Sequence, residues 1–254
     1  MDRLAAALER ARNEGSLARP GASHVPTPGA ARTREVGASA AALAGHHVGR
    51  GDQRDALADV FKHLRTQVLQ RMQDAGWQTL GITSPHAGDG RTTTAINLAM
   101  HVALDVDWTA ILVDANLETP GVTRAFGLPE LPGLGDYLMH GTALEELLVR
   151  TDVSRCVLLP AGARPPRASE MLGSARMRSL VEELKRRYAN RLVIVDMPPV
   201  LDSPAGPAML PAVDAVLLVV EEGRTWSEDA QRTAQLIGPA RLLGTVLNKS
   251  REEG

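Results

Sequence analysis

The chain has 254 residues, 44% of them hydrophobic, and a formal net charge of -2 at pH 7. This length fits one domain of about 200 residues with an extension, and the near-neutral charge argues against a strongly basic nucleic-acid-binding protein. The one cysteine cannot form an internal disulfide, and no apolar run approaches the ~18 residues of a transmembrane helix. The charged N-terminus lacks the apolar stretch of a signal peptide, so a cytoplasmic location is predicted.

The first 50 residues differ in composition from the rest of the chain. Apolar residues recur at helical spacing over residues 2–13, which predicts a short amphipathic helix. This predicted helix could be either a solvated terminus or a docking helix for a partner. Residues 15–50 are rich in Ala, Gly, Pro and Ser and predict a flexible linker. His46 and His47 in it could bind a metal, but without a nearby Cys or acidic ligand we expect a solvated pair. We therefore expect an N-terminal helix with linker over 1–50 and one folded domain over 51–254.

From residue 55 onward, apolar segments of strand type alternate with segments of helical periodicity. A helix predicted over residues 56–72 precedes the first strand. The predicted strands are 79–83, 110–114, 156–160, 191–196, 215–220 and 242–248, and the later predicted helices are 93–104, 143–149, 176–188 and 227–237. Near-continuous apolar strands separated by helices indicate an α/β fold with a mostly parallel sheet and helices on both faces.

A glycine-rich loop follows the first of these strands. Residues 83–94 read TSPHAGDGRTTT and connect a predicted strand to a predicted helix. Gly88 and Gly90 allow backbone N–H groups to approach phosphate oxygens closely, and the helix N-terminus favours an anion. The hydroxyl of Thr92 stands where such loops place a Mg²⁺ ligand, with Thr93 beside it. The loop predicts a phosphate-binding site.

Two of the apolar strands end in an aspartate. The segment AILVD ends at Asp114, and RLVIVD ends at Asp196. Because open α/β sheets bind ligands at the carboxyl ends of their strands, we expect these two carboxylates near the phosphate loop. They would there serve a bound Mg²⁺ ion.

At these residues the chain resembles the cytoplasmic kinase modules of bacterial tyrosine kinases (BY-kinases), P-loop NTPase-like proteins of capsular and exopolysaccharide biosynthesis. The resemblance covers about residues 55–249 and rests on six motifs in order. They read TSPHAGDGRTT, ILVDANLETP, GLGDYLMHG, LPAGARPPRASEMLGSARM, VIVDMPPV and GTVLNK. The resemblance implies a P-loop NTPase-like fold.

The resemblance also implies that the chain binds ATP and Mg²⁺. The implied nucleotide-binding residues are Gly88, Asp89, Gly90, Arg91, Thr92, Thr93 and Asn248, the last against adenine. The implied metal ligands are Thr92, Asp114 and Asp196. Asp114 and Arg91 are the implied catalytic residues, with Asp114 as general base or metal ligand.

Partners are implied in the same way. A membrane-embedded polysaccharide chain-length regulator (co-polymerase) would hold the protein at the inner membrane. The segment DVFKHLR is similar to a family motif used for ring assembly, so Asp59, Lys62 and Arg65 imply a homo-oligomer. From periodicity alone, the same segment is an amphipathic helix with a solvated charged face.

Three positions depart from the family pattern, and Pro85 departs from the general phosphate-loop pattern, which begins with a glycine. Arg91 replaces the loop lysine. A guanidinium keeps the charge but not the compact geometry of an ammonium group. Asn116 removes one acid from the second acidic motif, and Glu118 reverses the charge of an arginine two residues later. These departures are expected to weaken catalysis more than nucleotide binding.

Three functions remain open from the sequence. The first is a tyrosine kinase acting on a partner protein, since the family's tyrosine-rich tail is missing after Asn248 and Tyr137 and Tyr188 are expected to pack in helices. The second is a catalytically impaired pseudo-kinase scaffold that docks on the chain-length regulator. The third is a partitioning-type ATPase, against which His86 speaks because that group has a lysine early in the loop.

Overall fold

The computed structural model describes residues 34–35, 56–151, 153–186 and 190–250. The described residues belong to one compact unit, Arg32–Gly254. The helix predicted over 2–13, the His46–His47 pair, Tyr188 and most of the predicted linker lie outside the described residues.

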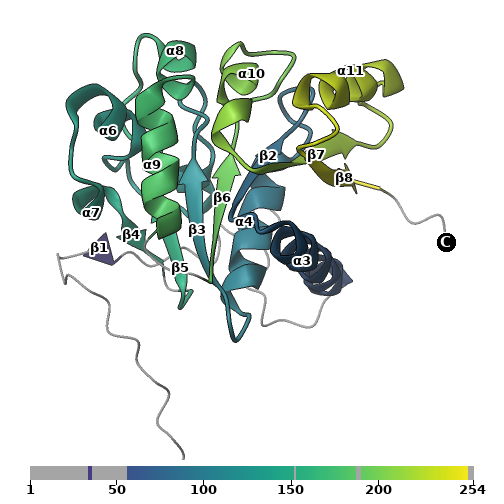
Figure 1. Cartoon of the computed structure of the whole chain (residues 1–254), viewed down its shortest axis with the longest axis horizontal. Helices are drawn as coiled ribbons and strands as arrows, with labels where there is room; N and C mark the ends of the chain where they lie inside the picture. Colours follow the sequence, from purple (N-terminus) through teal and green to yellow (C-terminus); the bar gives the residue numbers. More distant parts are fainter. Residues whose placement is uncertain (1–33, 36–55, 152, 187–189, 251–254) are drawn as a thin grey trace, which may run out of the picture. The chain divides into compact units, whose positions relative to one another are not determined.

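Within the described residues, one eight-stranded sheet has the strand order β1-β4-β5-β3-β6-β2-β7-β8 (Figure 1). The strands are β1 (Arg34–Glu35), β2 (Thr79–Thr83), β3 (Thr109–Asp114), β4 (Val149–Arg150), β5 (Cys156–Leu159), β6 (Arg191–Asp196), β7 (Ala215–Glu221) and β8 (Leu242–Asn248). All neighbours are parallel except β4 and β5. The predicted mostly parallel sheet is confirmed, and β2, β6 and β8 have the predicted bounds.

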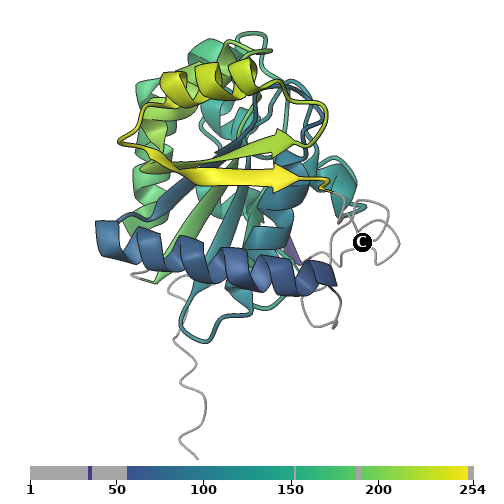
Figure 2. The ribbon, with the colours of Figure 1, turned by 90° about the vertical axis from the view of Figure 1, so that its right-hand side faces the viewer.

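Helices cover both faces of this sheet, as predicted. On one face, α3 (Ala56–Ala75) packs over α4 (Arg91–Ala103). On the other face lie α6 (Leu134–His140), α7 (Leu144–Leu147), α8 (Ala168–Leu172), α9 (Ala175–Arg186), α10 (Ala205–Met209) and α11 (Ser227–Ile237). Two short pieces, α5 (Val122–Ala125) and the 3₁₀ turn η1 (Leu210–Ala212), complete the elements. Figure 2 shows α3 and α11 on opposite sides of β7 and β8.

The central strands are largely apolar because both of their faces are covered. Every residue of β6 is buried. Leu192 and Ile194 pack toward α3 and α4, whereas Val193 and Val195 pack toward the opposite helices. The alternation of side chains along a strand therefore divides one apolar run between two cores.

One difference from the predicted elements lies at β4, and the helices α8 and α10 were not predicted. The helix predicted over 143–149 ends at Leu147, because Val149 and Arg150 pair with β5 in antiparallel and with β1 in parallel. Val149 is buried in this arrangement. The β1 residues fall inside the segment predicted as linker, and a two-residue edge strand has too little pattern to be recognised in sequence.

Candidate functional site

The glycine-rich loop connects β2 to α4, as predicted, and its glycines adopt backbone conformations that other residues rarely adopt. Gly88 has φ +95°, and Gly90, which precedes α4, has φ +99°. A Cβ atom on Gly90 would collide with the amide of Asn248, and one on Gly88 would lie 2.7 Å from Nη1 of Arg224. Both the conformation and the close contacts therefore require glycine.

Two buried carboxylates lie beside this loop. Asp114 and Asp196 are direct neighbours across the β3–β6 pair, and both side chains are fully buried. The Thr92 hydroxyl donates a hydrogen bond to Asp196 Oδ2 (2.7 Å). The strand ends of β3 and β6 lie at the same edge of the sheet (Figure 1). The structure thus brings together three side chains that are spread over about a hundred residues of the sequence.

Burial and mutual repulsion shift the titration of the two acids. Burial raises the pKa of Asp114, and the charge of Asp196 raises it further, although Asp114 accepts hydrogen bonds from the backbone N–H groups of Val122 and Asn116. Burial also raises the pKa of Asp196, against the opposing effects of Arg91 and Thr92. Two like charges at this depth are unfavourable without a cation between or beside them.

The carboxylates and the hydroxyl fit a divalent cation. The Oδ1 atom of Asp196 is buried and has no hydrogen-bond partner within the described part of the chain. Carboxylate and hydroxyl oxygens are the ligands that Mg²⁺ prefers. A divalent cation would be coordinated by Oδ1 of Asp196 and would relieve the repulsion between Asp114 and Asp196.

Arg91, at the position of the expected lysine, turns toward one of these carboxylates, Asp196. Its side chain is only 7% exposed, and its Nε lies 4.0 Å from Asp196 Oδ1. Nη1 donates a long hydrogen bond to Ser84 Oγ (3.4 Å). The guanidinium therefore serves in part as a counter-charge to Asp196.

The remaining predicted site residues line the loop to different extents. Asn248, at the end of β8, donates from Nδ2 to the backbone carbonyl of Asp89 (2.9 Å). The buried Asp89 carboxylate accepts the N–H of His86 (3.0 Å). Thr93 lies one position further along α4, where its carbonyl accepts a hydrogen bond from Asn97 (2.9 Å). The loop, the two acids and the end of β8 thus form one cluster, and Thr93 sits at its margin.

Two departures from the family pattern have structural partners. The Asn116 amide donates to the carbonyl (2.8 Å) and the hydroxyl (3.0 Å) of Thr119, which holds the turn after β3. Glu118 accepts a hydrogen bond from Ser203 Oγ (3.1 Å) in the segment after β6. Both substitutions therefore brace the segments that follow Asp114 and Asp196.

A bridge across the loop was not predictable from the sequence. His86 Nδ1 contacts Asp202 Oδ1 (2.8 Å), and its Nε2 contacts Asp229 Oδ2 on α11 (3.2 Å). The Ala87 N–H also donates to Asp202 (2.7 Å). The hydrogen bond with Asp202 raises the pKa of His86, partial burial opposes this, and Asp229 adds to it. The partners lie more than a hundred residues away in sequence, so no local pattern marks them.

Replacing His86 with glutamine should remove a pH-dependent part of the stability. Because the folded state raises the pKa of His86, its contribution is fully present below the unfolded pKa of about 6.5 and is lost as the pH rises through the folded value. The loss of unfolding free energy in His86→Gln should therefore be larger at pH 6 than at pH 9, measured by urea unfolding without nucleotide. The exposed His140→Gln is the control, and an equal loss at both pH values would contradict this assignment.

The sheet, the glycine loop and the two acids together define the class of protein. A mostly parallel α/β sheet, a glycine loop between β2 and α4, and acids at the ends of β3 and β6 are the features of a P-loop NTPase-like fold. No helix of the described residues combines the length and the apolar character needed to cross a bilayer.

Comparisons with known proteins then give the family. No protein-family model matches the chain. Tyrosine-protein kinase CpsD of Streptococcus agalactiae is 30% identical over 208 residues, which cover 79% of this chain and 86% of CpsD. Tyrosine-protein kinase YwqD of Bacillus subtilis is 29% identical over 193 residues, 75% of this chain and 80% of YwqD. The crystal structure of the chimerical protein CapA2B2 aligns with a TM-score of 0.74 at 25% identity, over 86% of this chain and 94% of that one.

The chain therefore belongs to the bacterial tyrosine kinase family of capsule and exopolysaccharide biosynthesis. The resemblance found in the sequence is confirmed, and so is the fold that it implied.

Proposed function

We propose that the chain binds Mg-ATP at the loop between β2 and α4 and transfers a phosphoryl group to a tyrosine of a partner protein. The observation that carries this proposal is the hydrogen bond of Thr92 to Asp196 beside Asp114, at the foot of a glycine loop. A threonine hydroxyl and two carboxylates at the phosphate side of such a loop are the groups that phosphoryl transfer needs.

Each predicted site residue has a role in this proposal. Backbone N–H groups of Gly88, Asp89 and Gly90 hold the phosphates, with Thr93 in the first turn of α4 beside them and Asn248 toward the base. Thr92 and Asp196, with Asp114 beside them, would hold Mg²⁺, which supplies charge neutralisation of the phosphates.

The reacting groups come from Asp114 and Arg91. Asp114 accepts the proton of the substrate tyrosine, for which a pKa raised toward neutrality by burial is suited. Arg91 contributes positive charge to the transferring group from its buried position beside Asp196. Because a guanidinium replaces the compact ammonium of the family, we expect slow transfer.

A second candidate function is a pseudo-kinase scaffold. It is favoured by the inward position of Arg91, whose Nη1 bonds Ser84 and whose Nε approaches Asp196. The guanidinium of Arg91 already partly neutralises Asp196, so Asp196 would attract a Mg²⁺ ion less strongly. In this case the chain would keep the fold for docking on the membrane chain-length regulator.

The partner and oligomer proposals rest on family membership and on α3. A cytoplasmic position at the inner membrane, held by the chain-length regulator, would suit either function. On α3, Lys62 and Asp59 form an exposed ion pair (2.8 Å), and Val60 is 60% exposed. Arg65 points inward, with Nη1 3.5 Å from the carbonyl of His101. If copies of the chain assemble through this face of α3, the exposed Asp59 and Lys62 would contact the neighbouring copy more directly than Arg65 would.

Calorimetric titration of Mg-ADP and Mg-ATP tests nucleotide binding. We expect micromolar affinity, about −8 kcal/mol, and Thr92→Val should weaken Mg-ADP about tenfold, because one hydroxyl ligand is lost. Thr66→Val, on the exposed face of α3, is the matched control. Labelled-phosphate transfer to a tyrosine-containing polymer follows. No binding to the wild-type chain would refute the kinase proposal and leave the scaffold.

A further inference from the structure

Three successive carbonyl groups of the glycine loop are held by side chains from the ends of β7 and β8. The carbonyl of Ala87 accepts a hydrogen bond from Arg224 Nη2 (3.2 Å), and that of Gly88 from Lys249 Nζ (3.1 Å). The next carbonyl, of Asp89, accepts the bond from Asn248 described above. All three donors lie in the segments that follow or end β7 and β8.

This arrangement orients the amide groups of the loop. A peptide unit is planar, and in the trans form its N–H points opposite to its C=O. Holding the carbonyls of residues 87, 88 and 89 therefore directs the N–H groups of Gly88, Asp89 and Gly90 away from β7 and β8. The positive φ values at Gly88 and Gly90, on either side of Asp89, alternate along the loop as in a backbone nest for anions.

One carboxylate holds the two cations in place. Glu221 Oε2, at the end of β7, lies 2.9 Å from Lys249 Nζ and 3.2 Å from Arg224 Nη1. Its side chain is 14% exposed, whereas the two cations are about half exposed at 49% and 55%. Lys249 also has a left-handed backbone, φ +58°, which turns the chain directly after β8. The largely buried acid therefore holds two half-exposed cationic side chains over the loop.

We propose that Glu221, Arg224 and Lys249 form a loop clamp, a set of positioning residues that holds the phosphate-binding N–H groups in their binding orientation before nucleotide arrives. The clamp rests on the proposed nucleotide binding and deepens it. It acts on the outer side of the loop, through carbonyls, and is distinct from Arg91, which lies on the inner side near Asp196. A chain without the usual loop lysine depends more on its backbone amides.

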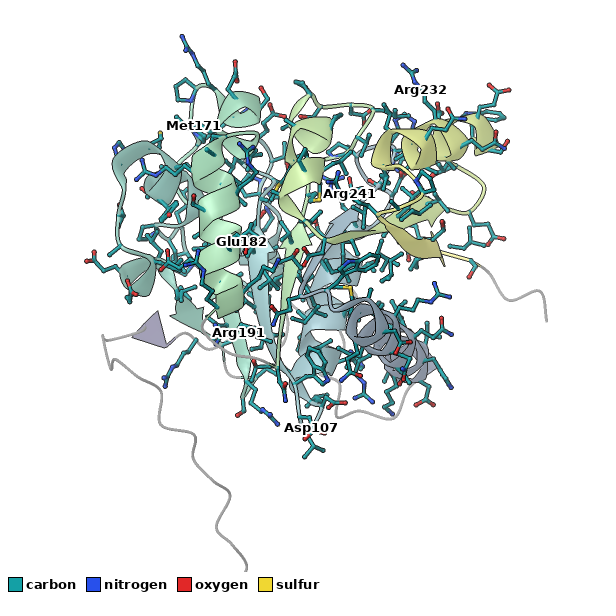
Figure 3. All side chains as sticks on the ribbon, in the orientation of Figure 1. Asp107, Met171, Glu182, Arg191, Arg232 and Arg241 are labelled. Atoms are coloured by element: carbon teal, nitrogen blue, oxygen red, sulfur yellow. The ribbon has the colours of Figure 1, made fainter. Side chains whose placement is uncertain are left out.

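The first test follows the loop without nucleotide. In the double variant Arg224→Met/Lys249→Met, ¹⁵N relaxation should show the amides of Gly88 and Asp89 falling from an order parameter of about 0.85 to below about 0.6. Glu221→Gln, which keeps both cations, should give a smaller fall in the same direction. Arg232→Met removes a charge on the outer side of α11 (Figure 3) and should leave the loop rigid. Unchanged order parameters in the double variant would overturn the clamp.

The second test measures affinity for ADP and for pyrophosphate by calorimetry. Loss of preorganisation in the double variant should weaken the binding of both ligands about tenfold. Among single variants, Lys249→Arg keeps the charge and the donor, so it should bind both ligands more tightly than Lys249→Met and nearly as well as the wild-type chain. Weaker binding with an unchanged loop would show direct charge attraction and overturn a positioning role. If the wild-type chain binds neither ligand, the proposed function fails, while the relaxation data still decide the clamp.

Discussion

Asp114→Asn is expected to stabilise the nucleotide-free protein at pH 8 and to slow the proposed phosphoryl transfer strongly. The folded state raises the pKa of Asp114 above its unfolded value of 3.8, because the group is buried and faces Asp196. The wild-type chain therefore loses stability as the pH rises from about 4 through the folded pKa, and the asparagine variant does not. A backbone hydrogen bond to Asp114 is weakened in exchange, at about 1 kcal/mol. The expected net gain at pH 8 is on the order of a few kcal/mol.

Urea unfolding at pH 5 and pH 8, without nucleotide or metal, measures this effect. The gain should be larger at pH 8 than at pH 5, and transfer should fall by roughly 10²-fold or more when the proposed base is removed. Asp107→Asn is the matched control, since Asp107 is exposed at the opposite edge of the sheet (Figure 3). A variant destabilised equally at both pH values would show that Asp114 carries no unfavourable charge in the folded state.

Arg91→Lys is expected to increase the proposed phosphoryl transfer, by on the order of 10²-fold. The guanidinium of Arg91 is engaged with Ser84 Oγ and lies 4.0 Å from Asp196. A lysine cannot form this forked interaction, and its compact ammonium suits a transferring phosphoryl group better. Single-turnover transfer at saturating Mg-ATP measures the gain, and affinity for Mg-ADP should change less, because the backbone amides of the loop remain.

The control for this change is Arg232→Lys, the same substitution on the outer side of α11 (Figure 3). If Arg91→Lys alters neither transfer nor affinity, Arg91 is not the limiting defect, and the cause moves to Asn116 and Glu118. Asn116→Asp then becomes the informative change, although it replaces the amide that holds Thr119. A gain from Asn116→Asp alone would contradict the assignment of the defect to Arg91.

Five of the six main strands, β2, β3, β5, β6 and β7, were predictable because each is largely apolar and mostly buried in the sheet. The sixth, β8, was predictable from its apolar residues although it lies at the edge of the sheet and is only partly buried. The bounds of β2 and β6 agree with those predicted. The glycine loop and the acids at the ends of β3 and β6 were predictable for a related reason, since parallel strands place their carboxyl ends at one edge. The short edge pair of β1 and β4 was not predictable, because two residues carry no periodicity.

The polar contacts that arrange the candidate site could not be predicted from the sequence. Local patterns gave no sign that His86 would join Asp202 and Asp229, or that Arg224 and Lys249 would hold the loop carbonyls. Nor did they show that Arg91 would turn toward Asp196. Periodicity reports which residues are buried along one segment, because burial follows the backbone repeat. Polar side chains in loops obey no such repeat, so their partners are decided only when the sheet brings distant strand ends together.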